Sequence, residues 1–190
     1  MHELTSAAVA LMVCVAAGSY LAGCCNGAII TSFLFYHDDI RKHGSHNAGL
    51  TNFYRVYGGK FAVCVILIDM LKAFVAVKLG SIVFGEYLGL RLEGEYFSAL
   101  FCVIGHIFPA FYSFKGGKGI ATTFGCLLGL LPFWTPVLVL ACIFIFYSTI
   151  LRITPNLSRT RVTYFTLPLG MLLMEVPLWI CFGTLCMTGM

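Results

Sequence analysis

Long stretches without a charged residue dominate the chain. Three of them, free of Asp, Glu, Lys and Arg, cover residues 4–37, 96–114 and 120–151. A helix needs about 20 mostly apolar residues to cross about 30 Å of hydrocarbon. The pattern predicts six apolar helices, over 5–34, 61–84, 97–112, 119–133, 135–152 and 163–186. The span 97–112 is short, and 119–133 is shorter still, with Pro132 and Pro136 at its end, so such segments are expected to be tilted, re-entrant or interfacial.

The composition fits this pattern and excludes several classes of protein. Hydrophobic residues form 59% of the 190 residues and charged residues 11%, whereas soluble domains have about 45–50% and about 25%. So few charges cannot cover a water-soluble surface, which excludes a soluble enzyme, a disordered chain and a nucleic-acid-binding domain. The prediction is one all-α domain over 1–190, a polytopic membrane helix bundle.

The basic residues are distributed unevenly among the predicted loops. Of the 12 Lys and Arg, four lie in 35–60, two in 113–118 and three in 152–162, while 85–96 carries three Glu and one Arg. Because short basic loops face the cytoplasm, these three loops are predicted to be cytoplasmic and the N-terminus outside. The first apolar run has no basic start and is too long for a signal peptide, so it is expected to be a retained helix.

The first basic loop is rich in small polar residues. Its hydroxyls and amides are Ser45, Asn47, Thr51 and Asn52, beside glycines that let backbone N–H groups approach a ligand, and Arg55 can hold a phosphate with two parallel bonds. The alternative is an ordinary basic loop with common turn residues.

The second basic loop places glycines and lysines directly before an uncharged helical run. It reads Lys115-Gly116-Gly117-Lys118-Gly119 and follows His106 and Pro109. Backbone N–H groups at a helix start and in a glycine turn form a site for phosphate. The spacing is not that of a Walker A loop, so no nucleotide is inferred. The alternative is a turn with basic membrane anchors.

A few polar residues fall within apolar segments, where charges are costly. Asp69 and Lys72 share one helix face, either as an ion pair that fixes helix packing or as part of a substrate site, and Glu175 lacks a local partner. His106 is either a hydrogen-bonded structural group or a functional one.

Small residues of the first helix, among them Gly18 and Gly23, predict close helix packing. The nine cysteines show no metal-ligand spacing.

Both polar loops are predicted at one membrane face. Two phosphate-suited loops there imply a phosphorylated substrate that meets a lipid. An enzyme of lipid synthesis therefore fits better than a channel, whose charges would lie within helices.

Three segments resemble the bacterial membrane acyl-phosphate:glycerol-3-phosphate acyltransferases. They are GSHNAGLTNFYR at 44–55, IDMLKA at 68–73 and GHIFPAFYSFKGGKGIAT at 105–122, in matching order and spacing. The resemblance implies acyl transfer from acyl phosphate to the sn-1 hydroxyl of glycerol 3-phosphate, which gives lysophosphatidic acid and phosphate. It also implies a protein of the cell inner (plasma) membrane with no metal and no cofactor.

The resemblance also implies roles for individual residues. Ser45 and Arg55 match residues needed for glycerol 3-phosphate, and Asn47, Thr51 and Asn52 match the other polar positions of that motif. The stretch that binds acyl phosphate corresponds to Gly116, Gly117, Lys118 and Gly119, with Lys115 and His106 beside it. Ser45, Arg55, Lys118 and His106 are expected to contribute to catalysis by charge and position, and His106 is not assigned as a general base.

The sequence departs from the family at two points. His46, Ala48 and Leu50 replace the usual residues of the first motif, and His46 would be strained if its φ were positive. The third family motif and the seventh helix that precedes it are not found after Arg161, so the sequence is expected to be a fragment or a divergent form. The alternatives to the acyltransferase are a carrier of a small phosphate anion and a non-catalytic homologue.

Overall fold

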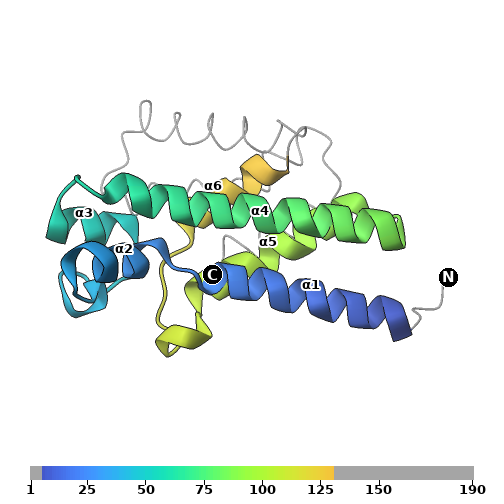
Figure 1. Cartoon of the computed structure of the whole chain (residues 1–190), viewed down its shortest axis with the longest axis horizontal. Coiled ribbons are helices and arrows are strands. Elements are labelled where there is room, and N and C mark those ends of the chain that lie inside the picture. The colour runs from blue at the N-terminus through green and yellow to red at the C-terminus, as the bar shows by residue number, and fades with distance from the viewer. Residues whose placement is uncertain (1–5, 131–190) are drawn as a thin grey trace, which may run out of the picture. The chain divides into compact units, whose positions relative to one another are not determined.

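The chain divides into two compact units, Met1–Gly129 and Leu130–Met190. The computed structural model describes residues 6–130, all but the last of which belong to the first unit. In chain order this part comprises α1 (Ser6–Cys24), α2 (Gly27–Tyr36), the 3-10 turn η1 (Ile40–Lys42), α3 (Leu50–Tyr57), α4 (Ala62–Leu88), α5 (Arg91–Ile107), the 3-10 turn η2 (Ala110–Tyr112) and α6 (Ile120–Gly129). The described part is helical without strands, as predicted, and α4 packs against α1, α5 and α6 (Figure 1).

The first apolar segment is two helices, so the prediction of one helix over 5–34 is wrong. The chain leaves helical geometry at Cys25 and Asn26, and α2 begins at Gly27. Asn26 has extended backbone angles, and its side chain accepts a hydrogen bond from the Ile29 N–H, which makes it the N-cap of α2. A Cβ at Gly27 would lie 2.6 Å from the Val65 carbonyl oxygen, so the start of α2 lies directly against α4.

The broken helix is bound by the charged pair of α4. Lys72 Nζ donates to the carbonyl oxygens of Gly23 (3.0 Å) and Cys25 (2.7 Å), and Asp69 Oδ1 accepts the Gly27 N–H (3.0 Å). The two side chains also pair with each other at 2.9 Å and are 7% and 2% exposed. An ammonium thus satisfies the carbonyl end of α1 and a carboxylate the N–H end of α2. Of the two interpretations of Asp69 and Lys72, the structure supports the ion pair that fixes helix packing.

α4 and α5 form a tight helical hairpin, so the loop expected over 85–96 is wrong. Only Gly89 and Leu90 separate the two helices. Glu95 is 5% exposed and accepts a hydrogen bond from Ser81 Oγ (2.7 Å), with Lys78 Nζ 3.9 Å from the same carboxylate oxygen. This acidic residue, expected in a loop, instead pairs across the two helices, where a buried carboxylate needs partners.

Membrane crossings can be assessed only for the described residues. Ser6–Cys24 and Arg91–Tyr112 are long and apolar enough to cross a bilayer. α4 has 27 residues, starts and ends close to the predicted 61–84, and contains several charges. The expected spans 135–152 and 163–186, Glu175 and the basic segment 152–162 lie outside the described residues. Six crossings and an outside N-terminus therefore remain predictions.

α1 and α5 touch through glycines on both helices. A Cβ at Gly23 would overlap the Cys102 carbonyl oxygen, and one at Gly105 would overlap that of Tyr20. Gly18 has nothing within 4 Å of the same position. The predicted close packing is therefore confirmed at Gly23 but not at Gly18.

This difference gives a matched pair of substitutions in one helix. Gly23→Ala should lower the thermal unfolding midpoint of the purified protein in detergent, because the added methyl group meets rigid backbone. Gly18→Ala should leave the midpoint unchanged or raise it, since alanine is favoured over glycine in a helix by up to about 1 kcal/mol. Equal midpoints for the two variants would contradict the close contact of α1 with α5.

Candidate functional site

The first polar loop is organised around the buried amide of Asn52. Asn52 is 2% exposed and lies in α3. Its Oδ1 accepts the Ser45 N–H (2.9 Å), and its Nδ2 lies within reach of the carbonyl oxygens of Ile40 (3.3 Å), His43 (3.0 Å) and Asn47 (3.1 Å). The amide therefore fixes the loop around Ser45. Direct contact of Asn52 with a substrate stays a prediction.

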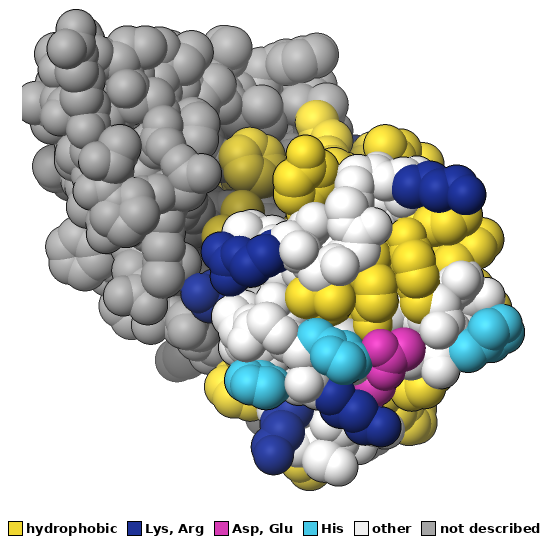
Figure 2. Space-filling view, turned by 90° about the vertical axis from the view of Figure 1, so that its left-hand side faces the viewer, with side chains coloured by type: hydrophobic (Ala, Val, Ile, Leu, Met, Phe, Trp, Pro, Cys, Tyr) yellow, Lys and Arg dark blue, Asp and Glu magenta, His cyan; other side chains and the backbone are white. Residues whose placement is uncertain are grey.

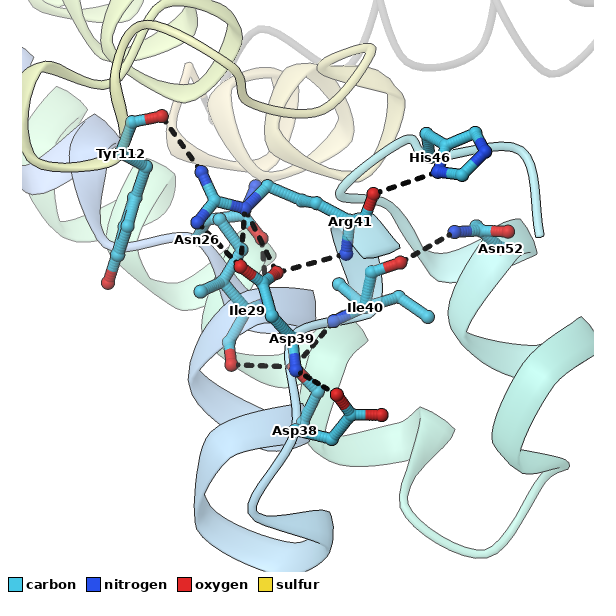
Figure 3. Close-up of polar contacts among 10 residues, drawn as sticks. Asn26, Ile29, Asp38, Asp39, Ile40, Arg41, His46, Asn52 and Tyr112 are labelled. Carbon is cyan, nitrogen blue, oxygen red and sulfur yellow. Dashed lines mark hydrogen bonds and ion pairs between the residues drawn. The ribbon is translucent and has the colours of Figure 1, made fainter. Parts of the chain in front are cut away.

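An ion pair joins this loop to the segment before the glycine turn. Figure 3 shows the Asp39 carboxylate held by the Arg41 guanidinium, whose Nη1 also donates to the Tyr112 carbonyl oxygen (2.8 Å). The hydrogen bond from Arg41 is the main reason why the pKa of Asp39 lies below its usual value. Arg41 also lies over the Tyr112 ring, 5.4 Å from its centroid.

A second cluster of polar side chains, around Asp38, connects the loop to α3. Asp38 Oδ2 accepts the Tyr57 hydroxyl (2.9 Å) and lies 2.6 Å from His43 Nε2. The Tyr57 hydrogen bond lowers the pKa of Asp38, while burial and then this same bond raise the pKa of Tyr57 to about 12. The charged form of Asp38 is thus the stable form at neutral pH and ties the loop to α3.

His46 has a left-handed backbone, which is the condition under which strain was expected at this position. Its φ is 58°, a region that non-glycine residues enter rarely, although His does so more readily than most. His46 Nδ1 lies 3.0 Å from the Arg41 carbonyl oxygen, so the imidazole can donate a hydrogen bond to it (Figure 3). This contact offsets part of the backbone strain at this position.

The glycine turn packs against His106 at the end of α5. The Gly117 N–H donates to the His106 carbonyl oxygen and the Gly116 N–H to that of Ile107, both at 3.1 Å. A Cβ at Gly116 would overlap the His106 carbonyl oxygen, and one at Gly117 would overlap His106 Nε2. Only glycine fits at these two positions, which keeps the turn against the helix end.

His106 also connects the turn to the charged pair of α4. It is 2% exposed, with Nδ1 2.9 Å from Lys72 Nζ and 3.4 Å from Asp69 Oδ1. The tautomer of the imidazole decides whether Nδ1 accepts a hydrogen bond from Lys72 or donates one to Asp69. The imidazole is therefore a buried link, which agrees with the structural alternative, and its catalytic part stays a prediction.

The two predicted loops meet in the structure. The Ala48 N–H donates to the Gly116 carbonyl oxygen (3.4 Å), and the Ala48 carbonyl oxygen accepts Asn26 Nδ2 (3.0 Å). The bonds from Ala48 to Gly116 and from Arg41 to Tyr112 each join segments separated by more than sixty residues. The sequence placed both loops at one membrane face, and their contact is a finding of the structure.

The predicted site residues separate into an exposed and a packed group. Exposed are Ser45, Thr51, Arg55, Lys115 and Lys118, half-buried are Asn47 and Gly116, and buried are Asn52, His106, Gly117 and Gly119. Thr51 and Arg55 are four residues apart in α3 and so lie on one face of it. Figure 2 shows Lys, Arg and His side chains on the face of the described residues formed by α2, α3 and the neighbouring loops, with an acidic side chain among them. The exposed Lys and Arg side chains suit an anionic ligand.

Sequence reasoning missed Asn26 and Arg41 as organisers of the site. Asn26 stands inside an uncharged run that predicts one helix, although an Asn before Gly is a recognised break signal. Arg41 counted only as a basic residue of the loop. Among residues 6–130 no group of three or more His, Cys, Asp or Glu could hold a metal ion.

The amino-acid sequence is similar to those of known acyltransferases. The family described as glycerol-3-phosphate acyltransferase matches residues 13–190. A glycerol-3-phosphate acyltransferase of Finegoldia magna is 46% identical over 132 residues, which are 70% of this chain and 62% of that protein. One of Pseudomonas fluorescens is 39% identical over 151 residues, or 80% of this chain and 76% of that protein.

The fold is similar to that of a solved membrane protein. The crystal structure of PlsY (YgiH), an integral membrane glycerol 3-phosphate acyltransferase, in its glycerol 3-phosphate form has a TM-score of 0.77. It is 24% identical, over 94% of this chain and 84% of that chain. At this identity the similarity concerns the fold.

The backbone at His46 gives a testable prediction. His46→Gly should remove the strain of a positive φ, and His46→Ala should keep it, while both lose the imidazole. The glycine variant should therefore be more stable than the alanine variant by about 1 kcal/mol, measured by thermal unfolding in detergent. A glycine variant no more stable than the alanine variant would show that position 46 does not need this backbone.

Proposed function

The chain belongs to the glycerol-3-phosphate acyltransferase family, and we propose that it transfers an acyl chain from acyl phosphate to the sn-1 hydroxyl of glycerol 3-phosphate. The products are lysophosphatidic acid and inorganic phosphate. The protein works in the inner (plasma) membrane, with its loops in the cytoplasm, where both phosphate substrates meet lipid. The matched part of the chain spans 62% of the length of the Finegoldia relative.

The contact of the first loop with the glycine turn is the observation that supports the proposal. The bond from the Ala48 N–H to the Gly116 carbonyl oxygen joins the loop that carries Ser45 to the glycine turn, which supports a shared site. Ser45 on one side and Lys115 and Lys118 on the other are exposed beside it. A reaction between two phosphorylated molecules needs two anion-binding groups held next to each other, and this pairing of loops supplies them.

The reaction itself asks little of a catalytic base. The sn-1 hydroxyl oxygen attacks the acyl carbonyl carbon, and the bond from that carbon to the phosphate oxygen breaks. Phosphate is a good leaving group and can accept the hydroxyl proton. Alignment of the two substrates and stabilisation of the developing negative charge then provide most of the rate.

In this proposal the exposed residues divide into those that bind glycerol 3-phosphate and those that bind acyl phosphate. Ser45 and Arg55 bind glycerol 3-phosphate, with Asn47 and Thr51 beside them. Lys115 and Lys118 bind the phosphate of the donor, since the N–H groups of Gly116 and Gly117 are engaged with the end of α5. The buried His106 and Asn52 hold the two loops in position.

The carrier alternative would use Asp69, Lys72 and Glu175 to line a path, and Glu175 lies outside the described residues. Asp69 and Lys72 are engaged with the backbone of α1 and α2 and with each other, which leaves them no free face for a moving anion. The geometry therefore favours the transferase over the carrier.

The purified protein should release inorganic phosphate from palmitoyl phosphate only when glycerol 3-phosphate is present, and lysophosphatidic acid should form in equal amount. Ser45→Ala and Arg55→Ala should each lower turnover by about 100-fold, the size expected when a bound substrate loses its alignment by about 1 Å. Arg91→Ala is the control, since Arg91 is exposed at the α4–α5 turn. Binding of glycerol 3-phosphate without product would favour the non-catalytic homologue.

Lys118→Ala should mainly raise the apparent KM for palmitoyl phosphate, by about ten-fold, because one charge-assisted hydrogen bond to phosphate is lost. The KM for glycerol 3-phosphate should change less. Lys60→Ala, which removes an exposed cation at the start of α4, serves as the matched control. An effect confined to the KM for glycerol 3-phosphate would contradict the assignment of the turn to the donor.

A further inference from the structure

Asn26 lies at the only point among residues 6–130 where the first apolar run leaves helical geometry, and both ends of its amide are used. It is fully buried. Oδ1 caps α2 through the Ile29 N–H, and Nδ2 donates to the Ala48 carbonyl oxygen, each at 3.0 Å. One end of the side chain thus starts a helix, while the other reaches 22 residues along the chain into the first polar loop.

The peptide that receives this bond is itself part of the contact between the two loops. Ala48 is fully buried and belongs to a small apolar core with Ile29, Phe53 and Val65. Its N–H donates to the Gly116 carbonyl oxygen, and a Cβ at Gly117 would lie 2.6 Å from its carbonyl oxygen. Ala48 is therefore held between Asn26 and the glycine turn.

The other side of the glycine turn returns to the same helix break. Gly117 is bonded to the backbone of His106, whose imidazole lies against Lys72, and Lys72 donates to the Cys25 carbonyl oxygen. Asn26 directly follows Cys25. A closed ring of contacts therefore runs from the break through the first loop, the glycine turn and His106 back to the break.

We infer that Asn26 is a positioning residue of the transferase, which sets the distance between the loop that carries Ser45 and the turn that carries Lys118. The inference rests on the proposed function. Without the amide donor, the Ala48 carbonyl oxygen is buried with one partner fewer, and the peptide relaxes away from its place between Asn26 and the turn. A shift of about 1 Å in aligned substrates can cost about 100-fold in rate.

The test separates the two ends of the amide. Ser is as good an N-cap as Asn, so Asn26→Ser keeps the start of α2 but is too short to reach Ala48. Asn26→Ala loses both interactions. If Asn26 positions the loops, both variants should lower kcat by about ten-fold or more, with smaller changes in the KM for either substrate. If it serves only as a helix cap, the serine variant should turn over like the unsubstituted protein, which would overturn the inference.

Ser81→Ala is the matched control for stability. It removes one buried hydrogen bond, to Glu95, between α4 and α5 and away from both loops. It should match Asn26→Ser in thermal unfolding midpoint and keep the kcat of the unsubstituted protein. Equal loss of kcat in both variants would assign the effect to general stability and overturn the inference.

Amide hydrogen exchange on the full chain in detergent distinguishes this inference from the proposed function. Exchange in 44–52 and 115–119 should rise in Asn26→Ser and not in Ser81→Ala, whatever reaction the protein performs. If exchange rises while the unsubstituted protein forms no lysophosphatidic acid, the proposed function fails and the link between the loops stands. If exchange in these segments is unchanged, the link itself is refuted.

Discussion

The structure depends on the hydrogen bonds made by the free backbone groups at the break between α1 and α2. A break in an apolar helix leaves carbonyl and N–H groups without partners, and each costs several kcal/mol in hydrocarbon. Lys72 supplies hydrogen atoms to the carbonyl oxygens of Gly23 and Cys25, and Asp69 accepts the N–H of Gly27. The two charges neutralise each other, so neither is buried without a partner of opposite charge. With the gap held in this way, α2 can leave the line of α1 and carry the first polar loop.

The functional loops are connected mainly through backbone groups. The Ala48 N–H meets the Gly116 carbonyl oxygen, and the N–H groups of Gly116 and Gly117 meet the end of α5. Side-chain amides and the Asp39–Arg41 pair then complete the connection. Because the framework uses few of the cations, Arg55, Lys115 and Lys118 stay exposed. Such a division between a rigid backbone frame and free charges suits a reaction in which alignment matters more than acid–base chemistry.

The sequence predicts two polar loops from local chemistry, through the glycines and lysines of 115–119 and the polar residues of 44–55. The structure shows that the two loops are in contact and that His46 has a positive φ, while anion binding stays a prediction. His106 and Asn52 are site residues by motif, yet the structure buries both within the framework. A motif records which residues a site needs, but does not tell a group that meets the ligand from one that supports its neighbour.

The sequence by itself determined the helical class, the apolar character, the gathering of cations in a few loops and the family. These follow from composition and from residue order within short windows, where hydrophobicity and turn chemistry act directly. Only the tertiary structure decided that the first run is broken at Cys25 and Asn26, that Glu95 lies in a helix, and that Asn26 reaches Ala48. In an apolar run a broken helix differs from a continuous one only by a short signal, here Asn26 before Gly27. The break is stabilised by Asp69 and Lys72, more than forty residues away in the sequence. Their side chains form hydrogen bonds with the Gly27 N–H and the Cys25 carbonyl oxygen at the break.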